Sequence, residues 1–347
     1  MGIIMLKVGL IGAGFMGNMH SVCYKALAEL DVAITAVADL REDKRQAVAN
    51  NFGAKQYETG IELIENADVD IIDICLPTYL HTEHALKAME KGRAVFIEKP
   101  VCLNEKEGKQ LLEAQKKYNS IVMVGQCVRM WDEYAWLKNT LDENTYGKII
   151  SGVFQRISPR PCWAWDNWLH TPERSGTVAL DMHIHDIDYI RYILGEPENL
   201  KVTASRDNEG VIQQMFATLE YPDSTIQTEV CWDYPEAFPF SMYFRIKCEK
   251  ATIVFDSAVS DSFIVYPTSG GMYKPEIAKH FELDTESDGN ISSLGGYYNE
   301  LKYFIECLKN KKQPIIAPLD EAVKSTMLCL KEIELAGGMV VACPDKL

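Results

Sequence analysis

KVGLIGAGFMG, residues 7–17, decides the fold because it joins an apolar run to a glycine loop at the start of a helical segment. The loop fits the spacing GxGxxG with Gly12, Gly14 and Gly17, and Phe15 and Met16 lie between the last two glycines. In such a loop the first glycine permits a tight turn, the second lets the backbone approach a pyrophosphate, and the third lets helix and strand pack closely. The helix N-terminus adds N–H donors and the positive end of its dipole. The motif alone also fits an ordinary strand–helix turn. The end of the next strand distinguishes a dinucleotide-binding loop from such a turn.

That strand is VAITAVAD, residues 32–39, and it ends in Asp39, 22 residues after Gly17. A carboxylate at this place accepts hydrogen bonds from the ribose hydroxyls of NAD and repels the 2′-phosphate of NADP. We therefore expect a dinucleotide site that binds NAD, with NADP less favoured. Arg41 keeps NADP open, because a nearby arginine can accommodate the 2′-phosphate.

Residues 1–126 alternate apolar runs with amphipathic stretches, which is typical of βαβ units. The fold class is therefore α/β, with an N-terminal Rossmann domain built on a doubly wound parallel sheet. After about residue 148 the runs alternate and are separated by turn residues, which indicates an antiparallel sheet. We expect residues 127–347 to form an α+β domain for substrate binding and oligomerisation, with a large, mostly antiparallel open sheet and closing helices at 295–311 and 319–338.

Ligands of an open parallel sheet bind outside the carboxyl ends of its strands. The residues that follow those ends are polar and specific, which predicts that the glycine loop and Asp39 are joined in the cofactor site by Leu76, Pro77, Thr78, Glu98, Lys99 and Gln126. Lys99 stands out because an apolar strand and a proline fix its backbone and direct its ammonium toward the crevice. Arg129 is a candidate for substrate binding, with pairing to a nearby acid as the alternative.

A second stretch, ALDMHIHDIDYI at 179–190, places three aspartates and two histidines in an apolar run. On an α-helix, Asp181, His185, Asp188 and Tyr192 share one stripe, at offsets of four, seven and eleven residues. A histidine that titrates near neutrality suits the removal of a hydroxyl proton as a hydride leaves the carbon. Asp181 could orient that ring.

Lys99 could stabilise the developing alkoxide charge on the same oxygen. We therefore expect Lys99, Asp181 and His185 to be catalytic and to contact substrate. Whether Lys99 or His185 accepts the proton stays open. His183 and His185 diverge by about 200° on a helix, so they cannot hold one metal ion together, and we expect no metal site. His183 fits a core histidine equally well.

The segment ISPRPCWAWDNWLHTPERSG, residues 157–176, holds three of the six tryptophans: Trp163, Trp165 and Trp168. Aromatic faces pack on the C–H faces of sugar and cyclitol rings, which predicts substrate contacts. Packing between domains or subunits is the alternative, since tryptophan is common at interfaces.

The motifs GAGFMG, PTYLH (77–81), EKP (98–100), GQCVRMW (125–131) and SGTVALDMHIHDID (175–188) occur in an order and spacing that resemble the Gfo/Idh/MocA oxidoreductases, which include inositol 2-dehydrogenases. The resemblance covers essentially the whole chain. It implies that Lys99 is the active-site lysine, that a cis bond precedes Pro100, that His81 helps to shape the cofactor site, and that Asp181 and His185 match the catalytic DxxxH pair. It also implies homodimers or homotetramers. One departure, Ser175–Gly176–Thr177 in place of two glycines, weakens inference about the substrate.

The composition argues against several classes of partner. A net charge of -15 without any long Lys/Arg block argues against nucleic acid and anionic membranes. Ten cysteines without a CxxC motif fit free thiols in a reducing cytoplasm. The apolar N-terminus lacks the pattern of a signal peptide.

The leading hypothesis is an NAD-dependent oxidoreductase that moves a hydride between nicotinamide and a ring carbon of a sugar, sugar derivative or cyclitol. One alternative is a redox-neutral NAD-dependent glycoside-processing enzyme. Another is a non-catalytic NAD-binding sensor or regulator, against which the presence of Lys99, Asp181 and His185 argues.

Overall fold

Two units, each with its own sheet, make up the chain in this computed structural model, which describes residues 5–277 and 295–337. One unit comprises Met1–Cys127 and Leu294–Lys324, and the other comprises Val128–Ser293 and Ser325–Leu347. The first boundary lies one residue from the predicted one. In this division residues 294–324 belong to the first unit, where the helix over 295–309 packs on the helix over 15–26 and on the strand over 122–125. The domain bounds 1–126 and 127–347 stay a prediction.

The first unit contains the predicted parallel sheet, with six strands in the order β3-β2-β1-β4-β5-β6. The strands are β1 (Leu6–Ile11), β2 (Val32–Ala38), β3 (Lys55–Tyr57), β4 (Ile71–Ile74), β5 (Ala94–Glu98) and β6 (Val122–Gly125). The order reverses between β1 and β4, and this switch point is where such sheets bind ligands.

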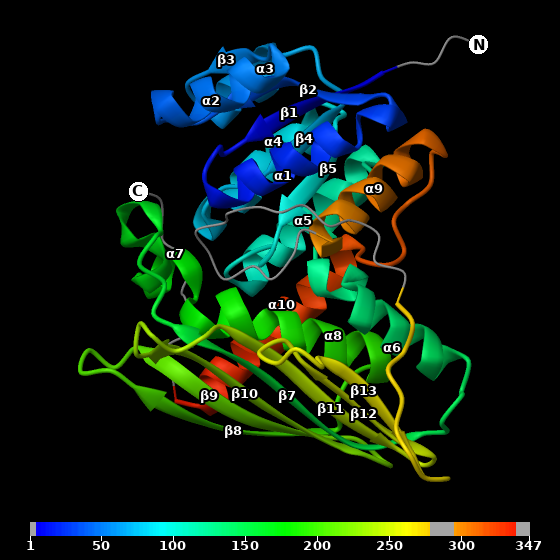
Figure 1. Cartoon of the computed structure of the whole chain (residues 1–347). Coiled ribbons are helices and arrows are strands. Elements are labelled where there is room, and N and C mark those ends of the chain that lie inside the picture. The colour runs from blue at the N-terminus through cyan, green and yellow to red at the C-terminus, as the bar shows by residue number, and fades with distance from the viewer. Residues whose placement is uncertain (1–4, 278–294, 338–347) are drawn as a thin grey trace. The chain divides into compact units, whose positions relative to one another are not determined.

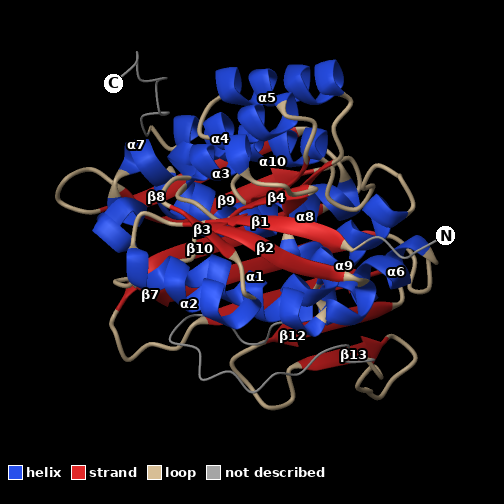
Figure 2. Ribbon diagram, turned by 90° about the horizontal axis from the view of Figure 1, so that it is seen from above, coloured by secondary structure: helices blue, strands red, loops and turns tan. Residues whose placement is uncertain are grey.

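Helices cover both faces of this sheet. They are α1 (Phe15–Ala26), α2 (Glu42–Phe52), α3 (Gly60–Asn66), α4 (His81–Glu90), α5 (Glu105–Tyr118) and α9 (Gly295–Lys309). Figure 2 shows α3, α4 and α5 on one side of the strands, and α1, α2 and α9 on the other. Because both faces are covered, β4 and β6 are buried along their whole length, as their apolar sequences predict.

The sequence of α5 shows why these helices form where they do. Its N-cap, Asn104, accepts a hydrogen bond of 3.0 Å from the backbone N–H of Glu107, which satisfies one of the orphan donors of the first turn. The helix buries Gly108, Leu111 and Ala114 on one face. It ends at Asn119, which adopts the left-handed conformation that stops a helix.

The second unit contains a seven-stranded sheet in the order β13-β12-β11-β7-β10-β9-β8. The strands are β7 (Ile149–Pro159), β8 (Asn199–Arg206), β9 (Ile212–Glu220), β10 (Thr225–Tyr234), β11 (Ser241–Cys248), β12 (Ala251–Asp256) and β13 (Phe263–Pro267). Every neighbouring pair is antiparallel except β7 and β10, which run parallel. The predicted mostly antiparallel open sheet is therefore confirmed.

One face of this sheet is covered and the other is open. The helices of the unit are α6 (Asp132–Asp142), α7 (Pro172–Ser175), α8 (Ile184–Leu194) and most of α10 (Leu319–Leu335). Along β10, Ile226 and Thr228 are buried whereas Thr225 and Gln227 are exposed, as the alternation of side chains in a strand requires. Figure 1 shows α8 along the covered face. In the described part of the chain, no helix covers the opposite face.

An aromatic cluster fixes α8 on the sheet. The ring of Tyr134 in α6 lies 4.8 Å from that of Tyr189 in α8 and 5.0 Å from that of Phe244 in β11, both edge to face. The Tyr189 hydroxyl donates a hydrogen bond of 2.6 Å to the Tyr134 carbonyl. Such aromatic pairs contribute about 0.5–1.5 kcal/mol each beyond their burial, so α8 has a defined rotation about its axis.

The helices α9 and α10 confirm the two closing helices predicted at 295–311 and 319–338. Gly337 follows α10 with φ 72°, as expected of a glycine that ends a helix, and Gly338 lies outside the described residues.

Candidate functional site

The glycine loop has the shape of a phosphate cradle. Gly12 has a φ of +91°, and a Cβ on Gly17 would stand 1.8 Å from the Gly12 carbonyl oxygen, so neither place accepts a side chain without movement. No side chain caps the N-terminus of α1 and no acid lies in its first turn. The loop therefore fits a pyrophosphate group, as the spacing predicts.

Asp39 follows β2 and lies against this loop. Its Oδ2 accepts the backbone N–H of Ala13 at 2.8 Å, and its Oδ1 accepts the backbone N–H of Arg41 at 2.8 Å. The Arg41 guanidinium also pairs with the carboxylate, with Nη2 2.9 Å from Oδ2. Burial acts to raise the pKa of Asp39, but the hydrogen bonds from Arg41 and Ala13 outweigh it and hold the pKa below its usual value. Asp39 is therefore an anion in place at the end of β2.

The loop after β4 contains the predicted residues Leu76, Pro77 and Thr78, and α4 begins at His81. The His81 ring is buried and bridges two loops, with Nε2 2.7 Å from the Leu76 carbonyl oxygen and Nδ1 2.9 Å from the Pro100 carbonyl oxygen. Burial lowers the pKa of His81 despite these two acceptors. The resemblance implies that His81 shapes the cofactor site, and the bridge between the β4 and β5 loops is consistent with that prediction.

The carboxyl ends of β5 and β6 carry Glu98, Lys99 and Gln126. The peptide bond between Lys99 and Pro100 is cis, as the resemblance implies. Lys99 itself is half-buried. Gln126 is buried, and neither its side-chain oxygen nor its side-chain nitrogen has a hydrogen-bond partner among the described residues. Because such a buried amide costs free energy when unpaired, it fits contact with a polar group of a bound nucleotide.

In the second unit, the stretch from Ser175 to Arg191 is buried at every residue except Asp181 and His185. The two side chains predicted to be catalytic are thus the two that reach the surface of this segment. The α-helix assumed for the stretch 179–190 is partly wrong, because Ala179–His183 forms a π-helical turn and the α-helix α8 begins at Ile184. Such wide turns occur often at functional sites, and here one contains Asp181.

The other acids and the other histidine of this stretch are buried in ion pairs. They pair His183 with Glu332 at 3.2 Å, Asp186 with Arg156 at 2.8 Å, and Asp188 with Arg129 at 2.6 Å. His183 also lies 2.9 Å from the Thr228 hydroxyl, so the reading of His183 as a core histidine is confirmed. Of the predicted stripe, Asp188 is buried in its pair with Arg129, whereas Asp181, His185 and Tyr192 are not buried. The predicted role of Arg129 in substrate binding stays a prediction.

The tryptophan segment lies mainly at the surface. Trp163 and Trp165 are 48% and 45% exposed, and Trp168 is half-buried. Between Trp165 and Trp168, both Asp166 and Asn167 have positive φ angles. The Asp166 carboxylate forms an ion pair with the Arg174 guanidinium, with Oδ2 2.9 Å from Nη1. The contact of these tryptophans with substrate stays a prediction.

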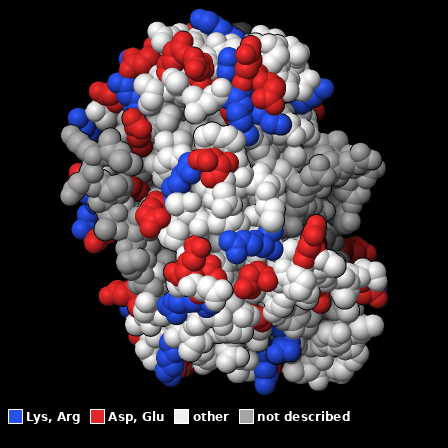
Figure 3. Space-filling view, turned by 90° about the vertical axis from the view of Figure 1, so that its left-hand side faces the viewer, with Lys and Arg blue, Asp and Glu red and all other residues white. Residues whose placement is uncertain are grey.

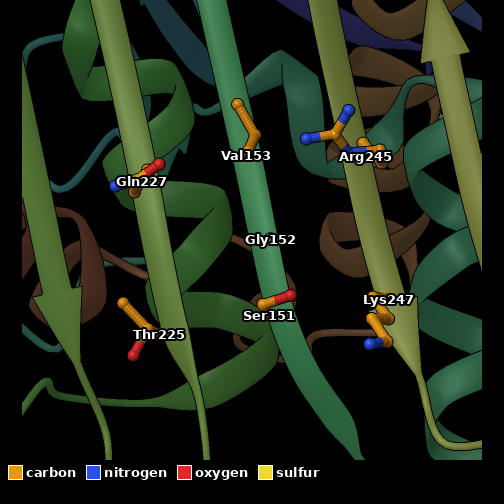
Figure 4. A pocket seen from close by; sticks show the side chains of 7 residues that line it. All are labelled: Ser151, Gly152, Val153, Thr225, Gln227, Arg245 and Lys247. Atoms are coloured by element: carbon orange, nitrogen blue, oxygen red, sulfur yellow. The ribbon is translucent and has the colours of Figure 1, made fainter.

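A hollow of about 230 Å³ lies elsewhere, on the open face of the second sheet. Figure 4 shows its lining, which consists of Ser151, Gly152, Val153, Thr225, Gln227, Arg245 and Lys247 from β7, β10 and β11. None of the predicted site residues lines it.

The described residues show the surface charges, the apolarity of the helices and the state of the cysteines. Charges of both signs are intermixed on the face seen in Figure 3. None of the helices in residues 5–277 and 295–337 is long and apolar enough to cross a membrane. The nine cysteines in these ranges are free thiols, and Cys343 lies outside them.

Four site-adjacent residues escaped the sequence reasoning: His20, Asp73, Gly125 and Glu300. All lie in the first unit, and His20, Asp73 and Glu300 are fully buried around Glu98. The signal that could have found them is Asp73, a carboxylate inside the run IIDICL, because a strand buried on both faces cannot hold an acid without a buried partner.

Comparison with known proteins places both units in one family. Residues 6–126 match the model of an oxidoreductase family with an NAD-binding Rossmann fold, and residues 134–254 match the GFO/IDH/MocA C-terminal domain. Myo-inositol 2-dehydrogenase of Thermotoga maritima is 31% identical over 333 residues, which cover 91% of this chain and 92% of that protein. The scyllo-inositol 2-dehydrogenase (NAD(+)) of Bacillus subtilis is 24% identical over 327 residues, or 92% of this chain and 90% of its own.

Among solved structures, levoglucosan dehydrogenase in complex with NADH and levoglucosan has a TM-score of 0.82 at 20% identity, with 96% of this chain and 97% of that chain covered. This likeness shows a shared fold across both units. With the glycine loop, the Lys99–Pro100 cis bond and the matches to both family models, the chain belongs to the Gfo/Idh/MocA family of oxidoreductases.

Proposed function

We propose that this chain is an NAD-dependent dehydrogenase that oxidises a ring hydroxyl of a cyclitol, sugar or sugar derivative. The observation that carries the proposal is the burial pattern from Ser175 to Arg191, where Asp181 and His185 are the two residues that are not buried. A segment built only for packing has no need to expose one histidine and one carboxylate together.

The proposal gives each residue a separate task. His185 accepts or shares the proton of the hydroxyl group, since an imidazole can act as a general base. Asp181 orients that ring and stabilises its protonated form. Lys99 donates a hydrogen bond to the substrate oxygen and stabilises negative charge there. When bound, NAD supplies the hydride acceptor, and the glycine loop, Asp39 and Gln126 are the residues that would hold it.

The substrate class rests on the relatives and on the tryptophans. The two inositol dehydrogenases named above span nearly all of this chain, and the solved neighbour binds the sugar derivative levoglucosan. Trp163 and Trp165 offer exposed aromatic faces of the kind that pack on sugar and cyclitol rings. We also propose a homodimer or homotetramer that forms through the open sheet face of the second unit, on which Phe216 in β9 and Tyr266 in β13 are each 43% exposed. Light scattering coupled to gel filtration tests that state.

A panel of cyclitols and hexoses, each assayed with NAD and in parallel with NADP, tests the function. The proposal expects NADH absorbance to rise with at least one member of the panel. Product formed without accumulation of NADH would instead identify the redox-neutral glycoside-processing alternative. Binding of NADH without turnover of any member would identify the sensor or regulator.

A further inference from the structure

Inside the first unit, three titratable side chains form a buried line that ends at Lys99. Asp73 comes from β4, His20 from α1 and Glu98 from the end of β5, with exposed fractions of 0%, 0% and 4%. His20 lies between the two carboxylates, with Nδ1 2.9 Å from Asp73 Oδ2 and Nε2 3.1 Å from Glu98 Oε1. The second Glu98 oxygen, Oε2, is 3.2 Å from the backbone nitrogen of Lys99, which donates to it. Polar contacts therefore run without a break from Asp73 to the backbone of Lys99.

His20 is a cation in this arrangement. Burial acts to lower the pKa of His20, but the charge of Asp73 and the hydrogen bond to it oppose burial, and the pKa is raised well above its usual value. An imidazolium attracts both carboxylates: Nδ1 is hydrogen-bonded to Asp73, and Nε2 contacts Glu98 at ion-pair distance without a hydrogen bond among the described residues. A neutral ring would lose this attraction to Glu98.

Glu300 closes the cluster from α9 without adding charge. It is fully buried, and neither of its carboxyl oxygens has a hydrogen-bond partner among the described residues. One of its oxygens lies within 4.8 Å of ring and carboxylate atoms of His20 and Glu98. Burial, and then the charge of Glu98, raise the pKa of Glu300 well above its usual value, so Glu300 is neutral near pH 7. Glu98 therefore has His20 as its cationic partner.

The walls of the cluster hold the Glu98 carboxylate in one place. The edge of the Phe96 ring packs on His20, with ring centroids 5.5 Å apart. On the neighbouring strand, a Cβ on Gly125 would stand 2.7 Å from Glu98 Oε1, so the glycine makes room for the carboxylate. Buried ion pairs are often no more stabilising than apolar packing. We therefore expect this cluster to orient the Glu98 carboxylate rather than to add stability.

We propose that His20 is a positioning residue for the reaction: by holding Glu98, it fixes the backbone of Lys99 and hence the direction in which the Lys99 side chain leaves the strand. The inference rests on the proposed role of Lys99. Its test therefore includes a measurement that needs no turnover.

Two substitutions of His20 separate positioning from packing. His20→Gln can still donate to Glu98 from its amide, whereas His20→Asn reaches only toward Asp73. We expect His20→Asn to lower kcat by roughly 10²-fold, the cost of misplacing a reacting group by about 1 Å, with the KM for NAD unchanged. His20→Gln should recover most of that loss. Asp73→Asn tests the far end of the line if His20→Asn does not fold, and it should lower kcat in the same direction.

His84→Gln is the matched control, because His84 is also a buried histidine of this unit but donates to the Leu80 carbonyl at 2.8 Å. We expect it to change the melting temperature and leave kcat unchanged. If kcat instead follows melting temperature across His20→Asn, His20→Gln and His84→Gln alike, His20 is merely structural and the proposal fails.

Reductive methylation of lysines, read by peptide mass spectrometry, reports on Lys99 without turnover. Relative to the exposed Lys44, Lys99 should be modified faster in His20→Asn than in wild type, and at the wild-type rate in His20→Gln. If the three proteins show these relative rates of Lys99 modification but the wild type oxidises no member of the panel, the positioning role is supported and the proposed function is rejected. An unchanged Lys99 rate in His20→Asn would overturn the positioning role. So would a stoichiometric metal in the wild type that His20→Asn loses.

Discussion

Arg41 lies across the carboxylate of Asp39, with its Nε 3.0 Å from Oδ1 and its Nη2 2.9 Å from Oδ2. The same Nη2 lies 3.2 Å from the place where a Cβ on Gly14 would stand, so the guanidinium borders the glycine loop. The acid that repels a 2′-phosphate therefore also holds the cation that could bind one. Cofactor preference is thus a property of the pair rather than of Asp39 alone.

Asp39→Ser should shift the preference toward NADP, because it removes the repelling carboxylate and releases Arg41. A hydrogen bond to a charged group contributes about 1.5–3 kcal/mol, so the ratio of kcat/KM for NAD to that for NADP should fall by roughly 10- to 100-fold. Steady-state kinetics with each cofactor measure the ratio. The double variant Asp39→Ser with Arg41→Ala should lose the gain, and equal ratios in the two variants would show that Arg41 has no part in it.

His183 and His185 should respond in opposite ways to substitution by asparagine. His185→Asn should lower kcat by roughly 10²–10⁴-fold with little change in melting temperature, because His185 is accessible and acts on a proton. His183→Asn should instead lower the free energy of unfolding by about 3–5 kcal/mol, since it leaves the buried Glu332 without its partner. Kinetics and thermal unfolding of both variants check this, and a stable, inactive His183→Asn would reverse the assignment.

Gly17 and Gly14 should differ in what an added methyl group disturbs. A Cβ on Gly17 meets the Gly12 carbonyl at 1.8 Å, so Gly17→Ala must move backbone and should cost about 1–3 kcal/mol of stability. A Cβ on Gly14 meets only the end of the Arg41 side chain, so Gly14→Ala should keep its stability and bind NADH more weakly. Thermal unfolding and NADH fluorescence titration separate the two effects. A Gly17→Ala variant with the wild-type melting temperature would show that helix and strand are not so close.

Glu300→Gln should change how stability depends on pH. The pKa of Glu300 is raised by burial and by the charge of Glu98. A carboxyl group with a raised pKa in the folded state contributes stability that is complete below its unfolded pKa of about 4.3 and is lost as pH rises toward the folded pKa. Glutamine has no such dependence. The melting temperature of the variant minus that of the wild type should therefore increase from about pH 5 to about pH 8, and a constant difference would contradict the buried, neutral Glu300.

The strands and helices that the sequence predicts are those with a strong apolar pattern. β3 and α3 were missed because β3 is three residues long, with polar Lys55 and Gln56, and α3 is a single short helix of seven residues. The π-helical turn at Ala179–His183 was missed because residue spacing is the same in the chain whether a turn closes after four residues or five. The return of α9 to the first unit depends on tertiary packing, which no local pattern encodes.

The local geometry of the candidate site was predictable where a motif fixes the backbone, as at Gly12, which has a positive φ, and at the cis bond after Lys99, while the roles of these residues stay predictions. It was not predictable where a side chain is decided by a distant partner. Arg129 and Asp188 are 59 residues apart, and only the fold shows that they neutralise each other. The same holds for His20 and Asp73, which are 53 residues apart. In the stretch 179–190, burial rather than residue type separates Asp181 and His185 from the other acids and the other histidine.

NADH formation by wild type and by Lys99→Met, with every member of the cyclitol and hexose panel, tests the central claim most directly. The account predicts that the wild type reduces NAD with at least one of them, and that Lys99→Met loses at least roughly 10²-fold in kcat while it still binds NADH. Turnover that survives unchanged in Lys99→Met, or a wild type that binds NADH and oxidises nothing in the panel, would contradict it.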